Sequence, residues 1–207
     1  MLQRYTTIGT ETVSVACADD QDAQAEWLLS CLLRLHNAGQ QVGDGIRMQV
    51  VGMLLSFRRL PAGHLAVCVP DVASDPFKDE TADVSAALQV LFEQINFAQK
   101  IDVEPVATSF QDKVLIDQGS LDDDNLFMIR SKPDAGQGDS GWYVGRQGAR
   151  EQAPALEAVF AFQLVKARPE LAASLVLPEG FMVMIGGSGV LSVTDADDRT
   201  RFTSSVR

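Results

Sequence analysis

Six residues in the second half of the chain, Gly136-Gln137-Gly138-Asp139-Ser140-Gly141, are of types that could do chemistry. Their glycines formally match the G-x-G-x-x-G pattern of dinucleotide-binding loops. Such a loop must lie between a strand and a helix, because the pyrophosphate binds at the helix N-terminus. Here Pro133 interrupts the approach, and Trp142-Tyr143-Val144 favours a strand after the glycines. The surroundings therefore argue against a nucleotide site.

The same stretch also presents a serine, since Gly138-Asp139-Ser140-Gly141 is similar to the nucleophile segment of chymotrypsin-like proteases. That chemistry requires a histidine base that is held by a carboxylate. Of the two histidines, His36 lies at the end of a predicted helix and His64 begins an apolar strand. Neither lies in a recognisable partner motif, and Trp142 follows the segment where a further glycine is expected. A small hydrolase that uses Ser140 is kept as an alternative interpretation.

The interpretation that we favour for this stretch is structural. Asp139 and Ser140 are expected to bond the backbone of a tight turn, because short polar side chains stabilise turns in this way. Gly141 would supply backbone dihedrals that other residues avoid, and Trp142 would fill the core. These residues imply no cofactor.

The remaining motifs do not indicate a metal or phosphate site. Gly186-Gly187-Ser188-Gly189 lacks the lysine and the following helix of a phosphate-binding loop, so it predicts a hairpin turn. Asp122-Asp123-Asp124 lacks the alternating ligands and the terminal glutamate of an EF-hand. Without a C-x-x-C pair, the three cysteines are predicted to be buried small hydrophobic residues and not zinc ligands: Cys17, Cys31 and Cys68.

Composition narrows the possible partners. The chain has 207 residues, of which 46% are apolar, enough for one large domain or two small ones. Its formal charge is −11, and such a surface repels phosphate backbones and anionic lipids, so we expect neither direct nucleic-acid binding nor membrane association. No apolar run is long enough to span a bilayer. The N-terminus lacks the apolar segment of a signal peptide, which predicts a cytoplasmic protein.

The first half of the chain alternates strand and helix patterns. Thr12–Cys17 alternates apolar and polar residues and predicts a strand. A helix follows, with Asp20 and Asp22 as candidate N-capping carboxylates, and ends near Asn37. The apolar stretches at residues 47–57 and 64–70 predict a hairpin or two sheet strands, and a second helix begins at Thr81 or Asp83.

The second half begins after a charged, glycine-containing segment at residues 119–125, which suits a linker or an exposed loop. The sequence as a whole predicts an α+β fold of two small subdomains, residues 1–118 and 119–207, each a short, mostly antiparallel sheet packed with helices. In the second subdomain the patterns predict strands at residues 126–130 and from residue 142, helices at 154–167 and 169–175, and a terminal hairpin of 181–185 and 190–193.

Three segments of this second half occur in an order that resembles a known bacterial family. Leu126–Lys132 is a strand with a serine-lysine step at its end, Asp139–Tyr143 contains Asp-Ser-Gly-Trp, and Leu177–Phe181 is a proline-glycine turn before a closing strand. In this order they resemble the immunity protein thirty-three family, also catalogued as a domain of unknown function, over residues 125–195. Where that family has an acidic step soon after the tryptophan, this chain has Gly145-Arg146-Gln147-Gly148.

The resemblance implies a cytoplasmic immunity protein that binds and neutralises a cognate toxin without any catalytic residue or cofactor. Members of the family inhibit toxins, among them effectors of type VI secretion systems. If the toxin is a nuclease, its cleft is basic, and an acidic inhibitor would bind it one-to-one with a fast association rate. A generic regulatory or adaptor module is a further alternative. We expect the contact to be made by acidic loop residues: Asp122, Asp123, Asp124, Asp71, Asp75 and Asp79.

Overall fold

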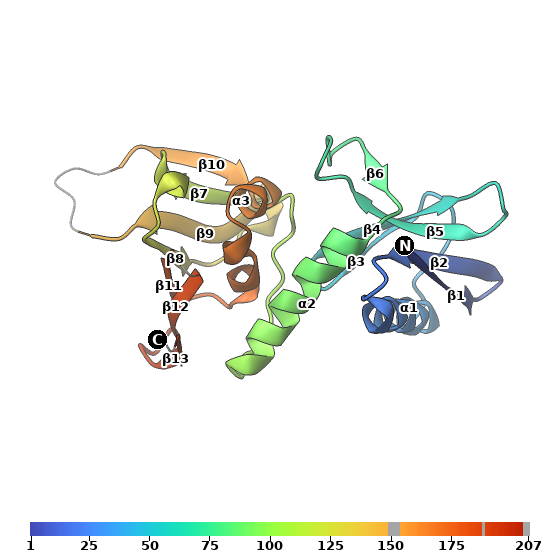
Figure 1. Cartoon of the computed structure of the whole chain (residues 1–207), viewed down its shortest axis with the longest axis horizontal. Coiled ribbons are helices and arrows are strands. Elements are labelled where there is room, and N and C mark those ends of the chain that lie inside the picture. Colours follow the sequence, from blue (N-terminus) through green and yellow to red (C-terminus); the bar gives the residue numbers. More distant parts are fainter. Residues whose placement is uncertain (149–153, 188, 205–207) are drawn as a thin grey trace. The chain divides into compact units, whose positions relative to one another are not determined.

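The computed structural model describes residues 1–148, 154–187 and 189–204. The chain divides into two compact units, Met1–Phe92 and Glu93–Arg207 (Figure 1). Each unit contains a mixed sheet and helices, which confirms the predicted α+β class. The predicted division after residue 118 falls inside the second unit, just after a strand, whereas the structural boundary lies within a helix.

The first unit is built on a sheet that starts with a hairpin. Its elements are β1 (Leu2–Ile8), β2 (Glu11–Cys17), α1 (Asp22–Asn37), β3 (Arg47–Val50), β4 (Met53–Arg59), β5 (Leu65–Pro70), β6 (Glu80–Thr81) and α2 (Ser85–Lys100), whose last residues belong to the second unit. The strands lie in the order β1-β2-β5-β4-β3, with β6 beside β5. β2 and β5 run parallel, and the other neighbours pair antiparallel. Helix α1 packs against β1 and β2 (Figure 1).

The apolar stretch at residues 47–57 predicts one strand, but the structure divides it into β3 and β4 at Val51-Gly52. Val50 pairs directly with Met53, so Val51 and Gly52 alone form the turn. Val51 and Gly52 both have positive φ, 46° and 83°, which the two-residue turn of a tight hairpin requires. The sequence does not predict a turn at this valine, because β-branched residues rarely adopt positive φ.

Helix α1 begins differently from the prediction. Asp20 and Asp22 do not cap it: Gln21 is the N-cap and makes no side-chain cap bond, and Asp22 lies in the first turn. The Asp22 carboxylate instead accepts hydrogen bonds from the guanidinium of Arg4 on β1. The cysteines of this unit are free and buried, as predicted: Cys17, Cys31 and Cys68.

The second unit contains a longer sheet, with strands in the order β10-β7-β9-β8-β11-β12-β13. β7 and β9 run parallel, and the other neighbours pair antiparallel. The elements, with three 3-10 helices labelled η among the described residues, are β7 (Lys113–Asp117), η1 (Ser120–Asp122), β8 (Leu126–Arg130), η2 (Ala135–Gln137), β9 (Asp139–Arg146), β10 (Leu156–Phe160), α3 (Ala161–Ala167), η3 (Pro169–Val176), β11 (Met182–Gly186), β12 (Gly189–Thr194) and β13 (Thr200–Thr203).

One helix prediction in this unit is wrong over its first part. Residues 154–167 show helical spacing, but residues 156–160 form β10 and pair antiparallel with β7, so that α3 is short. Each of these residues pairs with a residue of β7, from Leu156 with Asp117 to Phe160 with Lys113, and this tertiary pairing overrides local propensity. The second predicted helix, residues 169–175, is confirmed as a helix of the 3-10 type, η3. The predicted terminal hairpin is confirmed as β11 and β12, although Ser188 of its turn lies outside the described residues.

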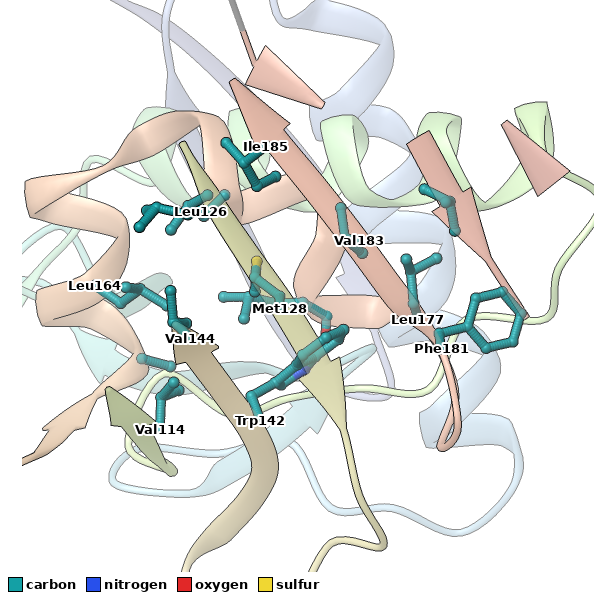
Figure 2. Close-up of a cluster of buried hydrophobic side chains, with 14 of the residues drawn as sticks. Val114, Leu126, Met128, Trp142, Val144, Leu164, Leu177, Phe181, Val183 and Ile185 are labelled. Carbon is teal, nitrogen blue, oxygen red and sulfur yellow. The ribbon is translucent and has the colours of Figure 1, made fainter. Parts of the chain in front are cut away.

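One face of the second sheet carries the core of this unit. Helices α3 and η3 cover that face, and Trp142 is among the largest fully buried side chains. Figure 2 shows the side chains gathered around β8, β9 and β11: Val114, Leu126, Met128, Trp142, Val144, Leu164, Leu177, Phe181, Val183 and Ile185. None of the helices in the described part of the chain is long and apolar enough to cross a membrane.

Candidate functional site

A buried arginine lies where the three motif segments of the second unit meet. Along β8, Leu126, Met128 and Arg130 all point to the core, because side chains alternate between the faces of a strand. Arg130 is only 1% exposed. The alternation in Leu126–Arg130 was the signal available in the sequence, since it places an arginine on the same face as two core residues.

The Arg130 guanidinium is held by main-chain carbonyls. Its Nε donates to the Ser140 carbonyl at 3.2 Å, and Nη1 donates to the carbonyls of Val106 and Leu177 at 2.8 and 2.6 Å. Nη2 donates to the Ala107 carbonyl at 3.3 Å. Burial lowers the pKa of Arg130 to about 10, while Asp112 opposes this by favouring the charged form. At neutral pH the group is therefore a buried cation that joins four points of the chain.

The backbone of Arg130 binds the proline-glycine turn as well. Its N–H donates to the Phe181 carbonyl at 3.0 Å, and its own carbonyl accepts from the Gly180 N–H at 2.7 Å. The strand at residues 126–130, the turn at 177–181 and the Asp-Ser-Gly-Trp segment thus contact one residue. Arg130 therefore holds the three segments together in space.

The Asp-Ser-Gly-Trp segment is predicted as a tight turn before a strand from Trp142, but it forms the first four residues of β9, paired irregularly with β7. Its polar atoms bond the chain itself. Asp139 Oδ1 accepts from the Gly141 N–H at 2.9 Å. Ser140 is 1% exposed, and its hydroxyl donates to the Lys113 carbonyl at 2.6 Å and accepts from the Trp142 N–H at 3.1 Å. A nucleophilic serine must instead be accessible and donate to a base. This geometry does not favour hydrolysis at Ser140.

Gly141 and Trp142 complete this irregular start of β9. Gly141 has φ +75°, and a Cβ there would lie 2.2 Å from the Ser131 carbonyl oxygen, so no other residue fits. The Gly141 carbonyl accepts from the Ser131 N–H at 2.8 Å. The indole Nε1 of Trp142 donates to the Leu175 carbonyl at 3.3 Å, and the Arg130 guanidinium carbon lies 5.6 Å from the ring centroid.

Three of the candidate contact acids lie in the first unit, in the loop between β5 and β6. Asp71 Oδ1 accepts from the Ala73 N–H at 3.0 Å, and Asp79 Oδ2 accepts from the Ser74 hydroxyl at 2.6 Å. Asp75 forms an ion pair of 2.8 Å with Lys78. The hydrogen bond from Lys78 lowers the pKa of Asp75. These three carboxylates therefore stabilise the loop that carries them, through bonds to other residues of that loop.

The other three acids lie in the second unit, in the loop between β7 and β8. Asp123 Oδ1 accepts from the Asn125 N–H at 2.9 Å, and Arg168 Nη1 donates to the Asp123 carbonyl at 2.6 Å. Asp122 and Asp124 are exposed. The bonds to Asp123 thus hold the loop in place, and the carboxylates of Asp122 and Asp124 are exposed to solvent.

A surface that sequence patterns did not single out lies on the other face of the second sheet. One row of cross-strand neighbours runs Leu115, Tyr143, Ile129 and Met182, on β7, β9, β8 and β11. Leu115 is 42% exposed, and Ile129 and Met182 are each 36% exposed. A second pair, Phe127 and Met184, lies beside this row. We call these six residues the open face.

Two aromatic side chains of the open face are held in place. The rings of Phe127 and Tyr143 meet edge to face with centroids 5.6 Å apart. The Tyr143 hydroxyl donates to Asp117 Oδ1 at 2.5 Å, and Asp117 Oδ2 accepts from the Arg146 N–H at 3.0 Å. A Cβ at Gly145 would lie 2.7 Å from the Phe127 ring, so the ring rests directly on the backbone there. The sequence signal for the open face was that β8 has apolar residues on both of its faces: Leu126 and Met128 on one, and Phe127 and Ile129 on the other.

Among the described residues, no group of three or more His, Cys, Asp or Glu side chains could hold a metal ion. The family model of the Imm33-like domain matches residues 93–196. The match starts at the first residue of the second unit and includes Arg130 with every carbonyl that its side chain binds. No curated protein and no solved structure matches the chain. Since the family match covers half of the sequence, the chain belongs to the Imm33-like domain family, as its three motif segments predicted.

Proposed function

We propose that this protein is an immunity protein that binds a cognate toxin and neutralises it in the cytoplasm of the cell that makes both. The observation that carries the proposal is the family match over residues 93–196. The role that the family name implies is consistent with the geometry of the second unit. Its buried polar residues Arg130 and Ser140 bond the chain itself, so they stabilise a fixed surface for a partner.

The toxin that we propose is a nuclease effector of a type VI secretion system, bound one-to-one. The formal charge of −11 supports a basic partner, because opposite charges accelerate association and oppose wrong pairings. A nuclease has a basic cleft for the phosphate backbone of its substrate. In this proposal the inhibitor covers or blocks that cleft and transforms no substrate.

Co-expression tests this proposal. The protein would be produced in cells that also express, from a separate inducible promoter, the polypeptide encoded beside it in its genome. We expect growth to stop with that polypeptide alone and to recover when both are present. Purified together, they should form a complex whose mass by light scattering equals one copy of each. Cleavage of added DNA or RNA by the partner should cease in that complex.

Two results would contradict the proposal at different levels. Toxicity that this protein does not relieve, together with the absence of a complex, would overturn the immunity function. A complex with a partner that cleaves neither DNA nor RNA would retain the immunity function and overturn the nuclease assignment.

A further inference from the structure

The open face of the second unit has the wrong chemistry for a surface that faces water. A sheet with one face on the core normally carries polar residues on its other face. Here the row from Leu115 to Met182 is apolar across four neighbouring strands, and three of its four residues are at least 36% exposed. Contiguous apolar surface of this kind marks interaction sites in water-soluble proteins.

The geometry points to the open face as the surface that docks the toxin, an inference that rests on the proposed function and names where the toxin binds. The occupant is a polypeptide with an apolar centre and basic residues along one side. The apolar centre would cover the row through Tyr143 and Ile129. The basic side would meet the exposed carboxylates of Asp122 and Asp124.

The position of these two carboxylates follows from the topology. Their loop leaves β7 and enters β8, and β9 lies between those strands, so the loop crosses the end of β9. Arg146 lies at that end of β9. Its Nη2 donates to the Gly119 carbonyl, and its Nε lies 3.9 Å from Asp123 Oδ2. Asp124 reaches the end of β11, because a Cβ at Gly187 would lie 3.9 Å from its carboxyl carbon. The acidic loop therefore borders the end of the sheet where β8 starts and β11 finishes.

The apolar residues nearest to this acidic border are Phe127 and Met184. Phe127 is the second residue of β8 and pairs with Met184 on β11 and Gly145 on β9. An interface that joins an apolar centre to a charged rim is the usual anatomy of a protein–protein contact. Here residues 122–129 contribute the acidic border and two open-face residues, Phe127 and Ile129, and this stretch lies within the family match.

The aromatic pair on the open face is already fixed before any partner arrives. Tyr143 is tied to Asp117 by its hydroxyl, and Phe127 lies against Gly145 and the edge of the tyrosine ring. Side chains that are fixed in advance lose little conformational freedom on binding, so more of the contact energy appears as affinity. Tyrosine and other aromatic residues are also typical centres of tight interfaces.

Charge decides between a toxin and a second copy of this chain as the occupant. Each copy carries a formal charge of −11, and two like-charged proteins repel one another as they associate. A basic partner gains attraction from the same charge. We therefore assign the open face to the toxin.

The test compares single lysine substitutions on the two sides of the sheet. Leu115→Lys and Ile129→Lys place a charge in the open face. Val106→Lys is the matched control, because Val106 is 41% exposed, close to the 42% of Leu115, and its carbonyl binds Arg130 on the covered side. Binding would be measured by calorimetry with the purified polypeptide encoded beside this protein. We expect the two open-face variants to bind about 30-fold more weakly or worse, and the control to bind like the unaltered chain.

Each variant must first be shown to unfold at the same urea concentration as the unaltered chain. If lysine unfolds the sheet, Leu115→Thr and Ile129→Thr replace it, because threonine suits a strand and still removes the apolar contact. With these variants we expect a smaller loss of affinity in the same direction.

The outcomes separate this inference from the function on which it rests. If the unaltered chain does not bind the polypeptide, the proposed function is wrong and the docking surface falls with it. If the unaltered chain binds but the open-face variants bind equally well, the docking surface alone is overturned. A free chain that is dimeric, and that Leu115→Lys converts to a monomer, would assign the open face to a second copy and overturn the inference.

Discussion

Arg130 lies over the indole of Trp142, with its guanidinium carbon 5.6 Å from the ring centroid, and donates through Nε to the carbonyl of Ser140, two residues before that tryptophan. The contact joins a charged side chain on β8 to the first residues of β9. Both side chains are 1% exposed. A cation that is so little exposed is stabilised by the ring and by the carbonyls that it contacts.

Replacing Arg130 tests whether this contact holds the second unit together. Arg130→Met keeps the length of the side chain and leaves four main-chain carbonyls without their donor, so we expect the free energy of unfolding to fall by about 3 kcal/mol or more. The free energy of unfolding of Arg130→Lys should lie between those of the unaltered protein and Arg130→Met, because an ammonium group cannot reach all four carbonyls. Urea unfolding measures both. Arg199→Met, at an exposed arginine, is the control and should have little effect.

Trp142 is expected to matter through folding. Trp142→Ala leaves a large cavity and should lower the free energy of unfolding by about 3–5 kcal/mol. Trp142→Phe keeps most of the packing and loses the bond to the Leu175 carbonyl, so its cost should be about 1 kcal/mol. The measurement is urea unfolding of each variant. A Trp142→Ala protein that is fully stable but no longer binds the toxin would make Trp142 a contact residue.

Ser140 is expected to be inert towards serine-directed reagents. Its hydroxyl is buried and donates to the Lys113 carbonyl, so incubation with a reactive phosphonate should leave the mass of the protein unchanged. Ser140→Ala should instead lower the free energy of unfolding by about 1–3 kcal/mol, since two buried groups lose their partner. Ser204→Ala serves as the control for unfolding. A specific adduct on Ser140 would revive the hydrolase alternative.

Charge reversal at the acidic loop tests the rim of the proposed interface. Asp122 and Asp124 are changed to lysine together, and Asp123 is left alone because it caps its own loop. We expect the association rate constant with the toxin to fall about tenfold at low salt and the difference to shrink at high salt. Asp19→Lys with Asp20→Lys makes the same change in net charge in the first unit. If both pairs of substitutions lowered the association rate constant equally, the net charge of the protein, and not the position of the acidic loop, would control association.

The cysteines are expected to be unreactive until the first unit opens. Cys17, Cys31 and Cys68 are at most 8% exposed, and burial raises the pKa of all three thiols. A raised pKa keeps the thiolate fraction small at pH 8, and thiolate is the form that reacts. A colorimetric thiol reagent at pH 8 should therefore detect three thiols only in denaturant. Rapid labelling of the native protein would contradict the structure of β2, α1 or β5.

Sequence patterns located the elements whose residues alternate or repeat regularly. Periodicity located β2, α1, α2, β8 and the β11–β12 hairpin, and the glycines of the hairpin turn supported the last of these, whereas the predicted N-caps of α1 were wrong. The three motif segments also pointed to the family, since their order can be seen in the sequence. Local chemistry therefore determined the fold class and the family.

Only the tertiary structure decided what depends on distant neighbours. β10 exists because β7 offers it an edge, and Arg130 is satisfied by carbonyls that are 10 to 47 residues away in the chain. Likewise, the open face appears only when β7, β9, β8 and β11 lie side by side, an order that differs from their order in sequence. A single sequence does not contain strand order, because that order is fixed by long-range packing.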